Sequence, residues 1–542
     1  MGNILSKDLD TNGHQDYYTY NIMNFDFRGY DKTRNSSQSL CKKHRDEKGW
    51  VMMMKQSGKR NLSMVMDLYE LTMANGYFND GDRETRVAFD VFYRKNPDRG
   101  GFAIFAGLEQ IVEYIEDLHF SDEDVVYLRS LNIFTEEFLE YLKTFRFSGD
   151  LYAFPEGTIM YPNEPVITIV APLIDAQLIE TAILAQVNHQ SLVATKTRRI
   201  VNAAAGKMVS DFGARRAHNM DAAVYGARAA YIGGAAGTAT VLAGQMFGIP
   251  VSGTMAHSWV MYYKDEYEAF KKYAENYPDS TTLLVDTYDT IQSGVPNAIR
   301  VAKEVLEPMG KRLKGIRIDS GDLAYQSRKV RKMLDEAGLE DCKIIVSNSL
   351  DEHTISSLNT QEAKIDGYGV GERLITGASS DYSEESISLL GAVYKIAAVE
   401  EDGIFSPRIK ISGTVEKITN PGLKKVYRIY DQNGKAKADL IAKADEVVDM
   451  SQDYRFVDPE MPWRNLKFTG CTAKALQVKI FENGKLVYKL PTLQEIRDYV
   501  SRQLEEEIWD EEQRFVNPHR HYMDMTPDYY ELKMGLLHGL RS

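Results

Sequence analysis

Cysteine is scarce in this sequence: among 542 residues only Cys41, Cys342 and Cys471 are present. They lie far apart and lack the spacing of metal ligands, which argues against a zinc site or a disulfide framework and fits a reducing compartment. No apolar run approaches the ~18–20 residues of a membrane span. No positively charged start leads into an apolar core, as it would in a secretory signal. We therefore expect a cytoplasmic protein with no membrane span.

Basic residues are also fewer than acidic ones, 65 against 78. The net charge is −13 and the isoelectric point is ≈ 5.4, which excludes the basic domain that a nucleic-acid surface requires. The exception is the stretch 190–260, which contains seven basic residues and only two acidic ones. No acidic residue lies between Asp221 and Asp265. An acid-free wall suits anions, because arginine binds carboxylate or phosphate through two parallel hydrogen bonds. Solvated helix faces explain part of the same charges equally well.

The length predicts roughly two to four domains. Residues 1–60 are polar and aperiodic, so we expect an extension that is disordered or extrinsic to the fold. Met1 to Ser6 match the loose myristoylation template, and an alternative start near Met54 would leave a chain that begins at a helical pattern. We divide the remainder into an α+β domain at 61–190, a catalytic α/β barrel at 191–410 and a C-terminal domain at 411–542.

Local patterns predict individual elements. Apolar spacing favours helices at 64–73 and 175–205, and alternation favours a strand at 86–92. Ser121 and Asp124 form a capping box, and the proline-punctuated stretch 149–172 suits short strands. Asn433-Gly434 and Asn483-Gly484 follow apolar runs as hairpin turns do. A final helical tail begins near Thr492.

One pattern recurs six times in the central part of the chain. A short apolar run ends in small or polar residues and a helical pattern follows, with the run endings at 210–213, 251–254, 284–287, 316–322, 345–348 and 368–371. Strands that alternate with helices predict a parallel barrel or sheet. In such folds the carboxyl ends of the strands meet at one rim, where the active site is built.

Several residues at these run endings are candidates for chemistry. His257 follows a run ending between Thr254 and Ser258, and it is either structural or a base or nucleophile able to carry a phosphoryl group. Asp319 and Asp322 are three residues apart, a spacing that suits ribose hydroxyls or Mg²⁺; capping of the next helix by Asp319 or Ser320 is the alternative. The glycine-rich turns 231–238 and 367–371 allow backbone amides to approach phosphate oxygens, or are simply turn geometry.

Four stretches together resemble the nicotinate phosphoribosyltransferase family. They are Met66 to Met73, Gly253 to Ser258, Leu284 to Tyr288 and Arg317 to Leu323. They stand in the family's order, and the resemblance extends from about Asn61 to the C-terminus. It implies a mixed α/β fold, with an N-terminal α+β domain, an irregular TIM-like α/β barrel and a small C-terminal domain.

The resemblance also implies a reaction. Nicotinate and 5-phosphoribosyl 1-diphosphate would give nicotinate mononucleotide and diphosphate in NAD salvage, with ATP as co-substrate and Mg²⁺ as cofactor. Such an ATP-coupled enzyme is classed as a carbon–nitrogen ligase. ATP would phosphorylate His257, and Asp319 and Asp322 would be catalytic, with Asp322 as a possible Mg²⁺ ligand.

The remaining roles follow from the same resemblance. Tyr69, supplied by the neighbouring subunit of a homodimer, and Phe212 would stack on the pyridine ring. Arg317 and Thr254 would hold the carboxylate, with Arg215 beside them. The phosphoribosyl group would be bound by the residues at two further run endings, namely Ser347, Asn348, Gly369, Gly371 and Glu372. Glu372 departs from the family, where some relatives carry threonine. An acidic side chain is awkward beside a phosphate, so Glu372 fits this role only if it binds through its backbone N–H.

The sequence leaves three other functions to be weighed. Nicotinamide phosphoribosyltransferase shares the layout, but it would want a carboxylate near the amide, and Ala236 stands in the corresponding glycine-rich turn. Quinolinate phosphoribosyltransferase is decarboxylating and needs neither ATP nor His257. A metabolite-binding regulator without activity would be expected to lack His257, Arg317 or Asp319, all of which are present.

Overall fold

The computed structural model describes residues 60–379, 389–414, 417–451, 454–459, 461–463 and 465–539. The predictions for the first 53 residues, acylation of Gly2 and a start near Met54 among them, lie outside these ranges. From Arg60 onward the chain forms one compact unit. None of the helices in the described ranges has the length and apolar character needed to cross a membrane.

The first sheet combines strands from both ends of the chain. Its seven strands are antiparallel throughout, in the order β13-β12-β1-β5-β3-β19-β20. Their bounds are Arg86–Phe92 (β1), Asp150–Ala153 (β3), Ile167–Pro172 (β5), Val393–Glu401 (β12), Ile404–Pro407 (β13), Val478–Glu482 (β19) and Lys485–Leu486 (β20). The predicted strand at 86–92 is confirmed, and Asn483-Gly484 makes the expected turn between β19 and β20. Strands placed by sequence in separate domains therefore share one sheet.

Helices cover this sheet and lead away from it. They are α2 (Leu68–Asp80), α3 (Leu108–Asp117), α4 (Asp122–Ser130), α5 (Glu136–Thr144), α6 (Leu173–Gln177) and α7 (Glu180–Ala203). The predicted capping box of Ser121 and Asp124 is confirmed at α4. The first predicted helix begins later than expected, because Asp67 and Glu70 form a capping box that starts α2 at Leu68. A two-stranded ladder of β2 (Ala103–Ile104) and β4 (Ile159–Met160) lies between these elements.

The second sheet carries the run endings. Its six strands are parallel, in the order β7-β6-β11-β10-β9-β8. Their bounds are Met208–Asp211 (β6), Gly237–Thr238 (β7), Thr282–Leu284 (β8), Gly315–Ile318 (β9), Lys343–Ser347 (β10) and Gly367–Val370 (β11). Small and β-branched residues let the strands be buried on both faces, as parallel sheets require.

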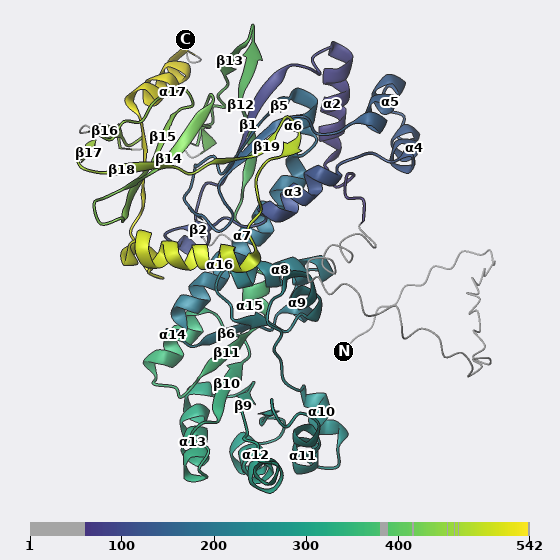
Figure 1. Cartoon of the computed structure of the whole chain (residues 1–542), viewed down its shortest axis with the longest axis vertical. Helices are drawn as coiled ribbons and strands as arrows, with labels where there is room; N and C mark the ends of the chain where they lie inside the picture. Colours follow the sequence, from purple (N-terminus) through teal and green to yellow (C-terminus); the bar gives the residue numbers. More distant parts are fainter. Residues whose placement is uncertain are drawn as a thin grey trace, which may run out of the picture. The chain divides into compact units, whose positions relative to one another are not determined.

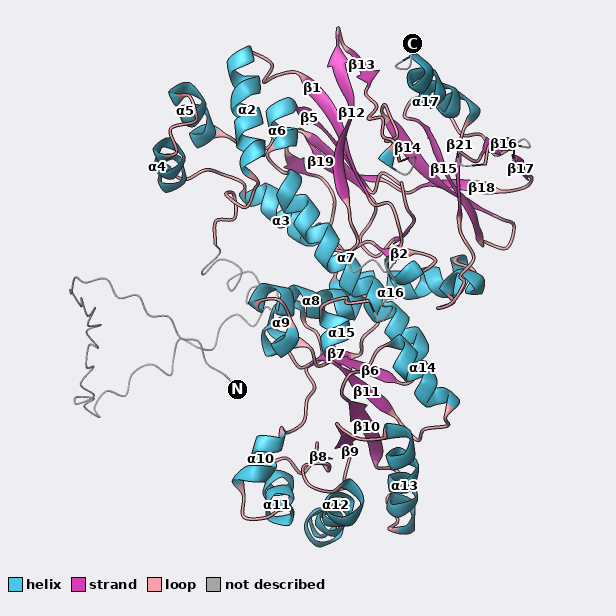
Figure 2. Cartoon of the chain, turned by 180° about the vertical axis from the view of Figure 1, so that it is seen from behind, coloured by secondary structure: helices cyan, strands magenta, loops and turns pink. Residues whose placement is uncertain are grey.

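Helices flank the parallel sheet, with α13 and α14 along one side and α10 to α12 near its β8 end (Figures 1 and 2). Their bounds are α8 (Met220–Ile232), α9 (Val241–Phe247), α10 (His257–Tyr262), α11 (Glu266–Asn276), α12 (Val295–Val301), α13 (Leu323–Glu336), α14 (Glu352–Thr360) and α15 (Glu372–Ile375). The sheet and helices share one continuous core of buried aliphatic residues.

Five of the six predicted strand endings are confirmed. The sixth is corrected: Val251 makes only an isolated parallel bridge to Thr238 rather than a strand. The two-residue strand β7 was missed, because Gly237 and Thr238 lie in a glycine- and alanine-rich stretch without apolar alternation. The pairings in the described ranges give an open order of strands, so what the structure shows is a mixed α/β protein with a parallel sheet.

The third sheet belongs to the C-terminal part, in the order β17-β16-β21-β15-β14-β18. Its strands are Lys424–Tyr430 (β14), Ala436–Lys443 (β15), Tyr454–Val457 (β16), Asn465–Phe468 (β17), Thr472–Ala475 (β18) and Tyr522–Met525 (β21). The hairpin at Asn433-Gly434 is confirmed between β14 and β15. The predicted helical tail is confirmed for α16 (Leu493–Arg502) and α17 (Pro527–Gly539), but β21 interrupts it and pairs in parallel with β15.

Candidate active site

The carboxyl ends of the parallel strands gather polar side chains around His257. The histidine is the first residue of α10, and its Nδ1 lies 3.0 Å from the Thr287 hydroxyl, just beyond β8. Its Nε2 lies 3.8 Å from Asp319 Oδ2, at the end of β9. The imidazole is 39% exposed, so a ligand can reach it. Thr287 was given no role from sequence, although it is the last residue of the predicted run ending at 284–287.

Asp286, also missed, organises the neighbouring loop. Its Oδ2 accepts hydrogen bonds from the Asp319 backbone N–H at 2.9 Å and from the Ser320 hydroxyl at 2.6 Å. Asp319 in turn accepts a short hydrogen bond from the Ser347 hydroxyl. Three strand ends are therefore linked through carboxylates. Oδ1 of Asp286 is buried and has no hydrogen-bond partner among the described residues.

Arg317 projects from β9 toward the segment after Val251. Its Nη1 donates to the Thr254 hydroxyl, and more weakly to the Met255 carbonyl at 3.4 Å. Its Nε is buried and unpaired within the described ranges. Burial lowers the pKa of Arg317, opposed by Asp319 and Asp286 and reinforced by the positive charge of Arg215. The guanidinium is thus an anchored cation with donors to spare for an anion.

Phe212 forms an aromatic surface beside this arginine. The guanidinium carbon of Arg317 lies 6.0 Å from the ring centroid, and the Phe212 N–H donates to the Val370 carbonyl at 2.8 Å. Gly369 makes room for the ring, because a Cβ there would stand 2.4 Å from two ring carbons. The structure therefore gives Gly369 a steric reason to be glycine that the sequence did not reveal.

Asp211 fixes the turn that carries Phe212. Its Oδ1 accepts from the Gly213 N–H at 2.8 Å and its Oδ2 from the Thr238 hydroxyl at 2.7 Å. Burial raises the pKa of Asp211, and the two hydrogen bonds oppose the rise. The carboxyl ties β6 to β7 and holds the aromatic residue at the strand end.

Asp322 has a local structural role. Its Oδ1 accepts from the Tyr325 N–H at 2.9 Å and caps α13, so the predicted cap at Asp319 or Ser320 is corrected. Asp322 is exposed, which leaves its other oxygen open to solvent. Within the described ranges no group of three or more His, Cys, Asp or Glu side chains could hold a metal ion.

The phosphate candidates lie at the ends of β10 and β11. Asn348 and Ser349 have φ of 87° and 47°, and such left-handed conformations cost about 1–3 kcal/mol each and are typical of binding sites. Gly371 precedes α15, and Glu372 is its exposed first residue. Their predicted contacts with phosphate stay predictions.

Of the two remaining predicted site residues, only Tyr69 stands apart from this group. Arg215 is exposed on the turn after β6, and together with burial its positive charge helps lower the pKa of Arg317. Tyr69 is 43% exposed on α2, which lies against the antiparallel sheet and not at the rim of the parallel one (Figure 1). Burial raises the pKa of the Tyr69 hydroxyl, and the negative charge of Glu180 acts in the same direction.

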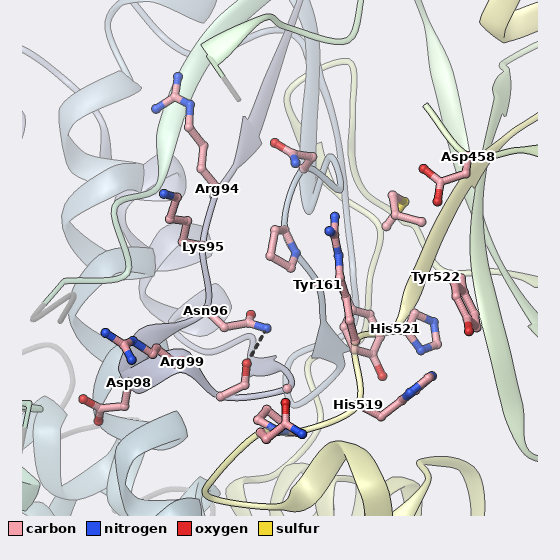
Figure 3. A pocket seen from close by; sticks show the side chains of 18 of the residues that line it. Arg94, Lys95, Asn96, Asp98, Arg99, Tyr161, Asp458, His519, His521 and Tyr522 are labelled. Carbon is pink, nitrogen blue, oxygen red and sulfur yellow. Dashed lines mark hydrogen bonds between the residues drawn. The ribbon is translucent and has the colours of Figure 1, made fainter. Parts of the chain in front are cut away.

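A cavity of about 1480 Å³ lies elsewhere, and no predicted site residue lines it. It is bounded by the loop 94–101, by residues 161–163 and by the C-terminal segment 515–523. Figure 3 shows Arg94 and Lys95 on one wall, with His519 and Tyr522 on the other. His521 stacks on Tyr161 at 3.8 Å between ring centroids.

These features define the chain as a mixed α/β protein with a candidate site of cationic, carboxylate and aromatic side chains at the strand ends of a parallel sheet. Comparison with known proteins makes the class specific. Residues 64–188, 208–432 and 423–533 match the N-terminal domain, the central family region and the C-terminal domain of nicotinate phosphoribosyltransferase (NAPRTase). The chain belongs to the nicotinate phosphoribosyltransferase family.

Individual relatives agree with this assignment. The chain is 48% identical over 485 residues to the nicotinate phosphoribosyltransferase of Bacillus subtilis, covering 89% of this chain and 96% of the relative. It is 34% identical to that of Dictyostelium discoideum, covering 86% and 87%. The crystal structure of human nicotinic acid phosphoribosyltransferase matches with a TM-score of 0.77 at 28% identity, covering 87% of this chain and 99% of the human one.

Proposed function

We propose that this protein transfers the phosphoribosyl group of 5-phosphoribosyl 1-diphosphate to nicotinate, giving nicotinate mononucleotide and diphosphate in NAD salvage in the cytoplasm. The observation that carries the proposal is Arg317, an anchored cation with a buried unpaired Nε beside the face of Phe212. A pyridine ring on Phe212 would direct its carboxylate at Arg317 and Thr254, with Arg215 adding positive charge. The names of the relatives agree with this substrate.

In this reaction the pyridine nitrogen attacks C1 of the ribose. A carbon–nitrogen bond forms while the bond to the diphosphate oxygen breaks, and the electron pair leaves with diphosphate. The attacking nitrogen is unprotonated, so the site needs positioning rather than a general base. Asp319 would hold the ribose hydroxyls, and Ser347, Asn348, Gly369, Gly371 and Glu372 would border the sugar phosphate.

Mg²⁺ would neutralise the leaving diphosphate. Asp322 is the proposed protein ligand, because it is exposed and presents a carboxylate oxygen beyond the one that caps α13. A single carboxylate together with phosphate oxygens is a donor set that Mg²⁺ accepts.

We propose that ATP phosphorylates His257. The γ-phosphorus–oxygen bond breaks as a phosphorus–nitrogen bond forms, ADP leaves, and water later hydrolyses the phosphohistidine. Thr287 and Asp319 hold the ring at the open face of the site, which supports this role. With γ-labelled ATP, acid-labile label is expected on the wild-type protein and not on His257→Ala. Undiminished label on His257→Ala would return the histidine to a structural role.

Tyr69 completes the site if the enzyme is a homodimer whose active sites are shared. Apolar side chains are exposed both on α2, at Leu68 and Met73, and near the parallel sheet, at Val241, Leu242 and Met246. Two copies in a head-to-tail arrangement would cover both groups. The test is complementation at a nicotinate concentration near the wild-type KM: Tyr69→Ala and Arg317→Ala proteins, each impaired in nicotinate binding, should regain activity when their subunits are mixed. If mixing restores nothing, the site is not shared in this way.

We further propose that the parallel sheet belongs to an irregular TIM-like barrel. Val251 extends the sheet beyond β7, yet Thr254 bonds to Arg317 in β9 and His257 contacts Thr287 after β8. The two edges of the open order thus approach each other through side chains.

A direct assay tests the proposed function. Purified protein would be supplied with 5-phosphoribosyl 1-diphosphate and either nicotinate or nicotinamide, with and without ATP. Strong preference for nicotinate and stimulation by ATP are expected. Preference for nicotinamide would overturn the assignment of Arg317 to a carboxylate.

A further inference from the structure

Two neighbouring residues of α2 lie near two neighbouring residues of α7. Together with burial, the negative charge of Glu180 helps raise the pKa of the Tyr69 hydroxyl. Glu70 Oε1 accepts from the Thr181 N–H at 3.2 Å and, by a short bond, from its hydroxyl. The same oxygen accepts from the Asp67 N–H at 3.2 Å. The first turn of α2, which presents Tyr69, is therefore tied to α7 through the Glu70 carboxyl group.

The position of that carboxyl is unusual for a capping residue. Glu70 is 0% exposed, and its Oε2 has no hydrogen-bond partner among the described residues. A buried carboxylate with an unpaired oxygen is costly, whereas Tyr69 beside it is 43% exposed. The arrangement joins a buried titratable group directly to a side chain that faces outward.

We propose, on the basis of the function proposed above, that Glu70 is a positioning residue: its buried carboxyl sets the orientation in which α2 presents Tyr69 to the pyridine ring bound by the partner copy. Glu70 does not touch the substrate. It acts through Tyr69, so its loss should weaken nicotinate binding and leave the sugar diphosphate unaffected.

The environment of Glu70 makes this contact sensitive to pH. Burial raises the pKa of Glu70 to about 7; hydrogen bonds from Thr181 and Asp67 oppose the rise, and the Glu180 charge adds to it. The titratable and charged groups that face it come from α2, α3, α7 and β12, namely Asp67, Tyr69, Tyr114, Glu180 and Tyr394, with Lys395 near Glu180. Above pH 7 an anion forms beside Glu180, and the first turn should loosen.

A double-mutant cycle tests the coupling. KM for nicotinate, KM for 5-phosphoribosyl 1-diphosphate and kcat would be measured at pH 6.5 without ATP, so that His257 phosphorylation does not contribute. Glu70→Ala is expected to raise KM for nicotinate about tenfold, the size of a lost aromatic contact, with kcat and the other KM unchanged. Combined with Tyr69→Ala, it should add nothing to the effect of Tyr69→Ala alone, because the two residues act as one unit.

The pH profile gives an independent readout. KM for nicotinate should rise between pH 6 and 8.5 in the wild type and stay flat in Glu70→Gln, which cannot ionise. Glu336→Gln, on the exposed face of α13, is the matched control and should behave as the wild type. The pH profile of Glu70→Gln tests the positioning role even if the Glu70→Ala protein fails to fold.

The outcomes separate the two proposals. If Tyr69→Ala leaves KM for nicotinate unchanged, ring stacking itself is wrong. If Tyr69→Ala raises that KM while Glu70→Ala does not, or while the two effects add, Glu70 is only a structural cap. An identical pH profile in the wild type and Glu70→Gln would overturn the positioning role as well.

Discussion

Arg228 and Arg317 show how differently this protein treats a buried guanidinium in its core and at its rim. Arg228 is fully buried and is bonded to Glu156 at 2.7 and 2.9 Å, to Glu109 at 2.9 and 3.2 Å, and to Gln190 at 3.0 Å. Arg317 donates hydrogen bonds to the Thr254 hydroxyl and, over a longer distance, to the Met255 carbonyl, and its Nε is unpaired among the described residues. The core arginine satisfies its donors within the chain, whereas the rim arginine keeps its Nε unpaired among the described residues. The comparison supports the role proposed for Arg317 without reference to any relative.

Removing Arg317 should produce the largest effect, and the effect should be on binding. Loss of one partner from a buried charge pair costs about 3–5 kcal/mol, so Arg317→Ala should raise KM for nicotinate by about 10²–10⁴-fold. Its free energy of unfolding should stay within about 1 kcal/mol of the wild type, because few internal contacts are lost. Steady-state kinetics and urea unfolding measure the two quantities. Arg300→Ala, an exposed cation on α12, is the control, and normal nicotinate binding by Arg317→Ala would refute the carboxylate clamp.

Removing Arg228 should reverse the pattern. Arg228→Met leaves the buried Glu156 and its neighbour Glu109 uncompensated, which should cost about 3–5 kcal/mol of stability. Adding Glu156→Gln should recover much of that loss, since the stranded charge is then gone. Urea denaturation followed by circular dichroism checks both variants. A stable Arg228→Met protein with a raised KM would mean that the core arginine also serves the ligand.

The sequence predicted most of the residues at the carboxyl ends of the parallel strands, but it did not predict the contacts between neighbouring strand ends. Strand endings at β6 and β8 to β11 were predictable because each combines a short, mostly apolar run with small or polar residues. The contact of His257 with Thr287 depends on how β8 and the segment after Val251 approach, which no local pattern encodes. The insertion of β21 beside β15 is likewise a pairing between distant segments. Gly369 was predicted to bind the sugar phosphate. Its packing against Phe212 becomes visible only once β6 and β11 are known to be neighbours.

That packing yields a smaller effect at the same rim. Gly369→Ala would place a Cβ 2.4 Å from two carbons of the Phe212 ring, and the ring must move. We expect KM for nicotinate to rise about tenfold, in line with a lost aromatic contact, while affinity for the sugar diphosphate changes less. Gly535→Ala on α17 is the control, because a Cβ there meets nothing within 4 Å. A larger change in the KM for 5-phosphoribosyl 1-diphosphate would instead support the phosphate role predicted for Gly369.

A change in stability rather than in binding is expected at a buried core carboxyl that has no cationic partner among the described residues. Asp175 is 3% exposed and accepts from the Ser148 N–H at 2.7 Å and hydroxyl at 2.8 Å. Burial raises its pKa from 3.8 to about 6, against the effect of these hydrogen bonds. Because the folded-state pKa is the higher one, the stability contributed by the protonated group is complete below pH 3.8 and is lost as the pH rises through about 6.

Asp175→Asn should therefore be more stable than the wild type at pH 7.5, by about 1–3 kcal/mol given 1.36 kcal/mol per pKa unit, and nearly equal to it at pH 4. Asparagine keeps an oxygen for Ser148, so the hydrogen bonds persist without the charge. Chemical denaturation at the two pH values measures the difference, with the exposed Asp402→Asn as control. Equal stability at both pH values would show that Ser148 alone compensates the buried charge. In that case hydrogen bonds in this core would be as effective for a carboxylate as Glu156 and Glu109 are for Arg228.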